Sequence, residues 1–132
     1  MRDLRGQEGA SAVEFAIIAP LLFMLVFAII GFGIAFMQLQ TIRGAVREGA
    51  RISAVGATVP QVQQKVGEAS TGIVPSGQVV VTPCPGRNTN VDTIASFDTS
   101  TLNGGSGIVV TLPLLPTIHM TPVVSASFRC ET

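Results

Sequence analysis

The chain has 132 residues, of which 47% are hydrophobic and only 12% are charged, and its formal net charge is zero. This length accommodates one domain of modest size. Eight basic residues against eight acidic ones leave no basic excess, so nucleic acid is not an expected partner. The chain has no Trp, no Tyr and a single His, which leaves few groups for acid–base catalysis. We therefore expect a protein that is not an enzyme.

The longest apolar stretch runs from Phe15 to Met37 and contains no charged residue. As a helix it would be about 34 Å long, slightly more than the ~30 Å hydrocarbon core of a bilayer. A cleaved secretory signal has an apolar stretch of only about 7–15 residues. A soluble chain of this size could not bury such a segment on all sides. The stretch therefore predicts a membrane-spanning helix with its apolar core at 15–37.

A short polar segment, MRDLRGQEG, precedes this helix and is followed by ASAVEF. Glu14 stands one residue before the apolar stretch. A carboxylate at this place marks the water boundary or interacts with the positive end of the helix dipole. Neither interpretation requires a function.

The combination of these features is more specific than the glutamate alone. A polar leader that ends at Gly9, with Glu14 five residues later, resembles the prepilin peptidase site of type IV pilin-like proteins. More closely, EGASAVEFAIIAPLLFMLV is similar to the start of the TadE family of minor pilin-like proteins, which belong to tight-adherence (Flp) pilus and secretion systems. The resemblance implies a leader at 1–9, cleavage between Gly9 and Ala10, and pairing of Glu14 with the N-terminal amine of a neighbouring subunit.

The apolar helix contains a proline and several small residues. Pro20 cannot donate a hydrogen bond to the carbonyl of Ala16, which predicts a kink there. The small residues suit either ordinary helix packing or lateral assembly with other helices. They are Ala12, Ala16 and Ala19, and further along Gly31 and Ala35.

The helix is expected to continue past the membrane to residue 56, which gives a long helix at 10–56. Its apolar residues keep helical spacing through Leu39, Ile42, Val46 and Gly49. Three arginines follow at four-residue steps: Arg43, Arg47 and Arg51. We expect them to anchor the helix at the membrane interface through lipid phosphates, or else to form a stripe for a partner. VREGAR is also similar to the AREAAR-type segment of TadE-like chains.

Residues 57–132 are expected to form a small extracytoplasmic α+β domain. Thr58 can cap a short helix that has Pro60 in its first turn. The runs GQVVVTP, GIVVTLPLL and PVVSASFRCE predict three antiparallel strands packed against the outer half of the long helix. The polar stretch 85–107 is expected to be a long loop with one short element at most. This order of elements and the closing S-F-R-x-E tail also resemble TadE.

Cys84 and Cys130 are the only cysteines, and no CxxC motif or spare His accompanies them. A metal site is therefore not expected, and no cofactor is expected either. Because the resemblance implies a domain outside the cytoplasm, we expect a disulfide between the two cysteines, which would stabilise the fold by about 4 kcal/mol in the chain-entropy model. Two free buried thiols are the alternative.

Other polar residues suggest no catalytic or metal site. His119 has no identifiable triad partner and is expected in a loop or at a strand edge. Asp92 and Asp98 could offer oxygens to calcium, but their spacing fits no known loop, so we expect solvated loop acids. Gly104–Gly107 follows Asn103 outside any strand–helix context and predicts a turn rather than a phosphate-binding loop.

Two arginines precede the apolar stretch and three follow it closely. A positive-inside count would place the C-terminal side in the cytoplasm, whereas the resemblance places it outside. We follow the resemblance and expect a single-pass protein of the bacterial inner membrane, with its C-terminal domain outside and a place in the extracellular pilus after assembly.

The predicted function is structural: a minor pilin or pseudopilin that helps to assemble a tight-adherence pilus or a related secretion filament. Its expected partners are membrane lipid, a prepilin peptidase, and other pilin-like subunits through the N-terminal helix. One alternative is an unprocessed single-pass subunit that stabilises a secretion or transport complex. The other is a membrane-anchored adhesion module whose loop at 85–107 contacts a surface.

Overall fold

The computed structural model describes residues 5–85 and 91–131, with side chains described from Gly9 onward. Residues 1–4 of the predicted leader and 86–90 of the predicted loop therefore lie outside the described residues. The elements, in chain order, are α1 (Arg5–Ala54), α2 (Val59–Ala69), β1 (Val80–Thr82), β2 (Asp92–Asp98), the 3-10 segment η1 (Thr99–Gly105), β3 (Ile108–Val110), β4 (Ile118–Met120) and β5 (Val123–Arg129).

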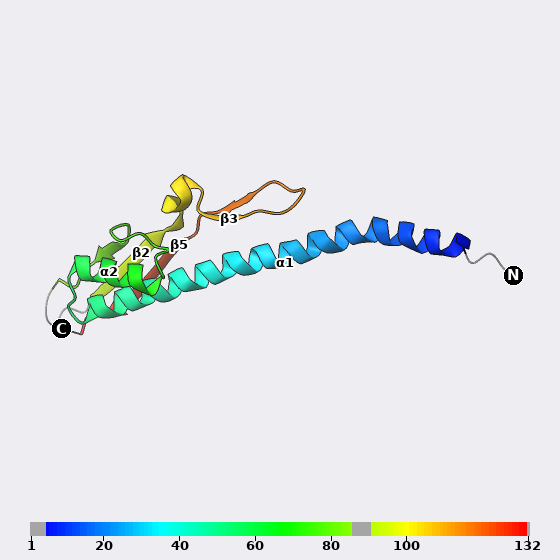
Figure 1. The fold of residues 1–132 in the computed structure, drawn as a ribbon. Helices are drawn as coiled ribbons and strands as arrows, with labels where there is room; N and C mark the ends of the chain where they lie inside the picture. Colours follow the sequence, from blue (N-terminus) through cyan, green and yellow to red (C-terminus); the bar gives the residue numbers. More distant parts are fainter. Residues whose placement is uncertain (1–4, 86–90, 132) are drawn as a thin grey trace.

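The molecule consists of one very long helix with a small α+β domain packed along its C-terminal half (Figure 1). α1 has 50 residues and includes Pro20 without a break in the helix. It ends at Ala54, where the backbone N–H of Gly56 donates to the carbonyl of Ser53 and Gly56 takes a φ of 95°. The N-terminal half of α1 projects away from the domain (Figure 1). The α+β fold predicted from the sequence is confirmed.

One face of the C-terminal half of α1 forms the centre of the core. Ile42, Val46 and Ala50 are fully buried, and Ala45 beside them is nearly so. These positions recur every three or four residues, which places them on one side of a helix. Of these positions, Ile42 and Val46 belong to the series whose helical spacing was noted in the sequence.

The short helix α2 packs on α1 where the longer helix has a glycine. Gly49 lies so close to Val66 that a Cβ atom at this position would collide with the valine side chain. α2 begins after Thr58, whose backbone N–H donates to Oε1 of Gln61 at 2.9 Å. Its buried side chains include Val62 and Val66, four residues apart. The predicted cap, proline and apolar face of this helix are all confirmed.

The main sheet has three antiparallel strands in the order β1-β2-β5. Its central strand, β2, pairs over its full length with β5, from Asp92 opposite Arg129 to Asp98 opposite Val123. The expectation of a long loop at 85–107 was therefore wrong, because this segment supplies the central strand. Thr93, Ala95 and Phe97 alternate toward the core and are completely buried. That alternation was visible in DTIASFD, but its small and polar members made the apolar signal weak.

A second, two-stranded sheet forms a hairpin from β3 and β4, with Ile108 opposite Met120 and Val110 opposite Ile118. The run GIVVTLPLL was predicted as one strand, but only its first part is extended. Pro113 and Pro116 follow in the connection, and proline cannot donate to a strand ladder. The hairpin lies along α1 beyond the three-stranded sheet and points toward the N-terminal half of the helix (Figure 1).

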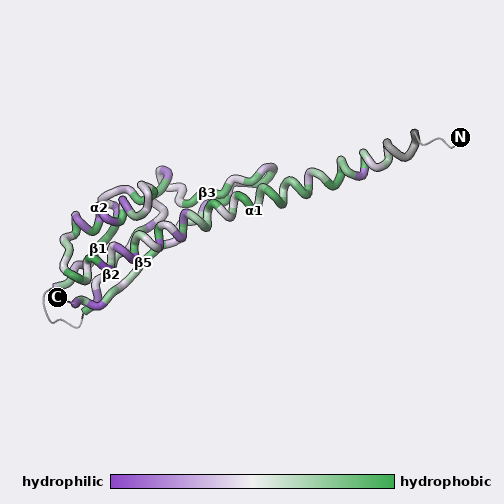
Figure 2. Tube along the Cα trace, turned by 60° about the horizontal axis from the view of Figure 1, so that its bottom comes forward, coloured by the Kyte–Doolittle hydropathy of each residue, from purple (hydrophilic) through white to green (hydrophobic). Residues whose placement is uncertain are grey.

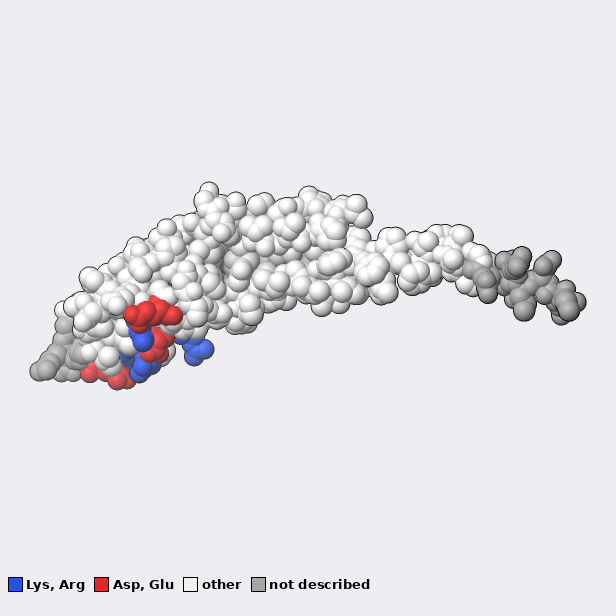
Figure 3. Space-filling model, viewed as in Figure 1, with Lys and Arg blue, Asp and Glu red and all other residues white. Residues whose placement is uncertain are grey.

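Hydropathy and charge divide the molecule along its long axis. Hydrophobic residues follow most of α1 and much of the hairpin, whereas hydrophilic residues concentrate around α2 and the three-stranded sheet (Figure 2). Lysine, arginine and acidic side chains gather at the end of the molecule next to the C-terminal end of α1, and most of the rest of this face carries none (Figure 3). In the sequence, 15–42 and 99–128 contain no Asp, Glu, Lys or Arg.

Candidate functional site: the uncovered helix and the arginine groove

Gly9, Ala10 and Glu14 all lie on the first turns of α1 and are exposed. The Gly9–Ala10 peptide bond, at which the resemblance implies cleavage, is part of the helical backbone. Glu14 forms no ion pair with any residue that the structure describes. Its carboxylate is thus available to a partner outside this chain, at the end of an apolar helix.

The part of α1 that follows Glu14 is apolar, and it is bare in the sense that the rest of the chain does not cover it. Only 6% of its most apolar 18-residue window is buried inside the molecule, and this one helix is long and apolar enough to cross a membrane. Large side chains are exposed all around it: Phe15, Ile17, Ile18, Leu21, Leu22, Phe23, Leu25, Phe27, Ile29 and Ile30. A helix that is hydrophobic on every side needs apolar surroundings. The small burial excludes the alternative of a core helix in a soluble domain.

The two groups of small residues on α1 have different surroundings. Ala12 and Ala16 are exposed on the bare segment and are free to meet another helix. Gly31 and Ala35, in contrast, are covered by this chain's own hairpin. A Cβ on Gly31 would lie 3.3 Å from Cγ1 of Val110, and Ala35 is only 2% exposed. Of the two alternatives left open for Gly31 and Ala35, the structure shows packing within the chain.

The three arginines predicted at the membrane interface divide into two kinds. Arg51 donates two hydrogen bonds to the carboxylate of Glu48, at 2.9 and 2.8 Å. This pairing lowers the pKa of Glu48 and raises the pKa of Arg51. Arg43 and Arg47 form no ion pair within the described part of the chain. Two guanidinium groups without a carboxylate partner are suited to bind a phosphate or carboxylate from another molecule.

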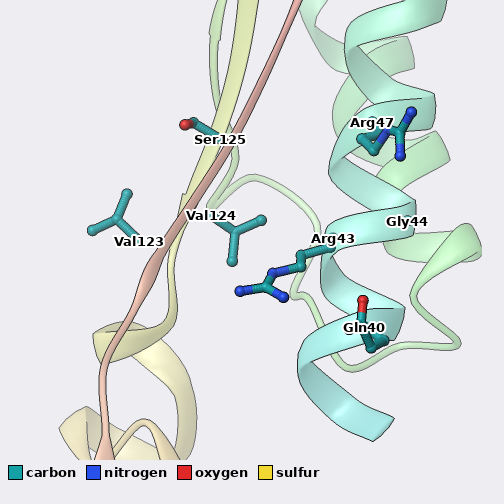
Figure 4. Close-up of a pocket in the computed structure, with 7 residues that line it drawn as sticks. All are labelled: Gln40, Arg43, Gly44, Arg47, Val123, Val124 and Ser125. Atoms are coloured by element: carbon teal, nitrogen blue, oxygen red, sulfur yellow. The ribbon is translucent and has the colours of Figure 1, made fainter. Parts of the chain in front are cut away.

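Arg43 and Arg47 line a groove between α1 and β5 with a volume of about 430 Å³. Val124 forms part of the opposite wall, and the Arg43 side chain extends across the groove toward it (Figure 4). Arg47 lies one helical turn further along α1 (Figure 4). The groove was not predicted, because its second wall comes from β5, far away in the sequence.

Cys84 and Cys130 form a disulfide, with their Cα atoms 5.9 Å apart. The bond joins the segment after β1 to the residue after β5. Two backbone hydrogen bonds lie beside it, from the N–H of Cys130 to the carbonyl of Val91 and from the N–H of Glu131 to the carbonyl of Ala54. The C-terminal end of the sheet is thus fastened to the end of α1. Disulfides persist in oxidising compartments outside the cytoplasm.

The remaining polar candidates do not form a site. Asp92 and Asp98 stand at opposite ends of β2, about 20 Å apart at the usual rise of a strand, so they cannot share a cation. They belong to a strand and not to a loop as predicted. His119 is exposed on β4, with its Nδ1 atom 3.1 Å from the carbonyl oxygen of Ser106. The described residues contain no group of three His, Cys, Asp or Glu that could hold a metal ion.

The predicted turn at Gly104–Gly107 overlaps the end of η1 and leads into the hairpin. Gly107 takes a φ of 70° and lies against the carbonyl of Met120, so that a side chain at this position would collide with the partner strand. The turn therefore depends on this glycine for a close approach of two backbones.

Comparison with known proteins gives one match. Residues 9–51, about a third of the chain, match the family model described as TadE-like protein. No curated protein and no solved structure matches the chain. The matched segment begins at Gly9 and covers Glu14, the bare apolar helix, and all three arginines. The segment that carries the N-terminal motif and the long apolar helix is thus similar to the TadE-like family.

Proposed function

We propose that this chain is a minor pilin-like subunit, a pseudopilin, that helps to assemble a tight-adherence pilus or a related secretion filament. Its role is structural, without enzymatic activity. One observation carries the proposal: a bare apolar helix begins with Gly9, Ala10 and an exposed Glu14, within a segment that matches the TadE-like family. The alternative is an unprocessed single-pass subunit of a transport complex.

The chemistry of Glu14 supports assembly through the helix. Cleavage after Gly9 would give Ala10 a free ammonium group. In an apolar environment two opposite charges attract strongly, and an unpaired charge there is costly. Glu14 of one subunit and the amine of a neighbour would therefore satisfy each other only in the correct register, which favours ordered assembly over random association of helices.

The disulfide supports an orientation with the α+β domain outside the cytoplasm. This agrees with removal of a short leader on the cytoplasmic side of the membrane. It disagrees with a simple count of positive charges on the two sides of the apolar stretch. We give the disulfide more weight than this count.

The first test is the intact mass and N-terminal sequence of the full chain coexpressed with a prepilin peptidase. We expect a mature protein that begins at Ala10 and lacks Met1–Gly9. Gly9→Leu is the control, because a bulky residue at the cleavage site should leave the leader in place. A wild-type chain that keeps Met1 in the presence of an active peptidase would overturn the proposal in favour of the unprocessed subunit.

The second test concerns Glu14. Glu14→Gln keeps the size of the side chain and removes its charge, so incorporation into filaments should fail while membrane insertion and cleavage continue. Glu14→Asp keeps the charge and should assemble better than Glu14→Gln. Equal assembly of the wild type and Glu14→Gln, measured in sheared filament fractions, would reduce Glu14 to a boundary residue.

A further inference from the structure

The β3–β4 hairpin reaches the part of α1 that is expected to lie in the membrane. Its connection, residues 111–117, reads TLPLLPT and turns beside Gly31. Leu112 also approaches Gly31, with Cδ2 3.6 Å from the position of a glycine Cβ. Ala28, one turn closer to the N-terminus, packs against the same buried cluster. A segment from the end of the chain thus covers one face of the apolar helix.

The length of α1 places this contact at the surface of a bilayer. A hydrocarbon core of ~30 Å corresponds to about 20 helical residues. If the core begins at Ala10, it ends near Ile30, and if it begins at Phe15, it ends near Ala35. The first placement puts the contact at Gly31 at the outer boundary of the hydrocarbon, and the second puts it about 6 Å inside that boundary.

The composition of the hairpin tip, defined here as residues 112–116, suits that boundary. Leu114 is 93% exposed and Leu115 is 43% exposed, although both are large and apolar. Pro113 and Pro116 have no N–H group, which reduces the number of backbone donors that would need a partner away from water. The backbone N–H of Leu115 is directed to the carbonyl of Leu112, at 3.5 Å.

The absence of charge extends over the whole of this region. No Asp, Glu, Lys or Arg occurs in 99–128, which includes the hairpin, or in 15–42 of α1 beside it. The first charged residue that α1 presents after its apolar segment is Arg43, about 18 Å beyond Gly31 along the helix. A hairpin that faced only water would have no physical reason to avoid charge in this way.

We propose that the tip of the β3–β4 hairpin contacts lipid, entering the interfacial layer of the outer leaflet beside α1. It penetrates no deeper, because irregular backbone exposed to lipid is not tolerated within the hydrocarbon. Lipid is the occupant, rather than a second protein copy, because the tip continues the same uncharged surface as the bare helix at the same depth. The contact limits how far α1 sinks into the membrane. This inference rests on α1 crossing a bilayer and is independent of leader cleavage and filament assembly.

The test is depth-dependent fluorescence quenching of the full chain in vesicles of phosphatidylethanolamine and phosphatidylglycerol. A single cysteine replaces Leu114 and carries an environment-sensitive dye, and the two native cysteines stay in their disulfide without reductant. Two matched labels serve as controls: Phe23→Cys in the bare part of α1 and Val80→Cys on β1, both at exposed apolar positions. Three vesicle preparations carry the nitroxide quencher at different depths: on the lipid headgroup, at a shallow position of the acyl chain, or at a deep position of the acyl chain.

We expect the label at position 114 to be quenched severalfold more strongly than the label at position 80, and best by the headgroup or shallow nitroxide. The label at position 23 should respond best to the deep nitroxide. Leu115→Cys gives a second label on the tip, in case Leu114→Cys disturbs the turn. Agreement between the two tip labels supports the proposal.

Two results would overturn the proposal while leaving the membrane helix intact. In the first, positions 114 and 115 resist quenching as position 80 does, although position 23 is quenched. In the second, the dye on the tip reports an apolar environment only when the number of protein copies per vesicle rises, and the lipid nitroxides do not quench it. That result would show that the tip contacts a second copy of the chain. An unquenched label at position 23 would overturn membrane spanning itself and this inference with it.

Discussion

Two glycines of α1, five residues apart, differ in what surrounds them. Gly49 faces α2 at a distance that leaves no room for a methyl group beside Val66. Gly44 has open space where a Cβ would lie. The sequence showed only that Gly49 shares the helical spacing of the apolar residues, whereas the contact with Val66 shows why the residue must be small.

We predict opposite effects of alanine at these two positions. Gly49→Ala should lower the free energy of unfolding by about 1–2 kcal/mol, because overpacking against a stiff valine outweighs the better helix propensity of alanine. Gly44→Ala, the matched control, should raise it by about 0.5–1 kcal/mol. Urea-induced unfolding in detergent micelles measures both. Equal effects of the two variants would contradict the close contact between α1 and α2.

Asp98 caps the η1 segment that follows β2. Its Oδ1 atom accepts a hydrogen bond from the backbone N–H of Ser100 at 2.8 Å, which lowers the pKa of the carboxyl group below its ordinary value of 3.8. The stabilisation is therefore fully present above this ordinary value and is lost as the pH falls through the lowered pKa.

Asp98→Asn should weaken this acid dependence. The amide oxygen can still accept the bond from Ser100, so we expect a small loss of stability at neutral pH and a flatter decline in acid. The comparison is made by urea unfolding of both proteins at neutral and at acidic pH. The lowered pKa of Glu48 contributes in the same direction in both proteins and cancels in the difference. An identical pH dependence of the two proteins would show that the cap does not matter for folding.

At the scale of elements, the sequence predicted the helices better than the strands. The apolar run and the spacing of Ile42 and Val46 were enough to place α1, and a threonine with a following proline was enough for α2. β1 and β5 were found because each has consecutive β-branched residues. These signals are local, so they can be recognised without knowing the fold.

The central strand β2 was missed because its assignment depends on contacts that are distant in the sequence. Its buried Thr93 lies between two other elements: its hydroxyl donates to the carbonyl of Thr82 in β1, and it is 2.7 Å from the hydroxyl of Ser53 in α1. Outside this environment a threonine indicates nothing about burial. The hairpin and the arginine groove were missed for the same reason, since each forms between elements far apart in the chain.

A deletion tests the importance of this strand. Removal of 91–107 should leave α1 in the membrane but destroy the packing of the domain, because β1 and β5 would lose the strand between them. Limited proteolysis should then cut residues after 57 rapidly, whereas the wild-type domain resists. A protease-resistant deletion variant would contradict the central position of β2. Deletion is therefore no test of the alternative in which the segment 85–107 contacts a surface, because it would also unfold the domain.

For the whole molecule, the disulfide determines how firmly the domain is attached to the end of α1. The two cysteines are 46 residues apart in sequence and enclose β2, β3, β4 and β5. A double variant, Cys84→Ala with Cys130→Ala, should lose about 4 kcal/mol of stability in the chain-entropy model. Thermal unfolding in micelles measures the change, and the reduced wild type should behave similarly. A loss below about 1 kcal/mol would show that the sheet and α1 hold the domain without the bond.

The coverage of Gly31 and Ala35 by the hairpin limits the geometry of any fibre built from this chain. Only about 27 Å of α1, from residue 9 to residue 27, has no part of its own domain beside it. Helices of adjacent subunits can pack on all sides only within that length. A neighbour displaced along the fibre axis by more than this distance would meet the hairpin or the sheet instead of the bare helix. The hairpin thus sets an upper limit on the axial offset between subunits that share a helix contact.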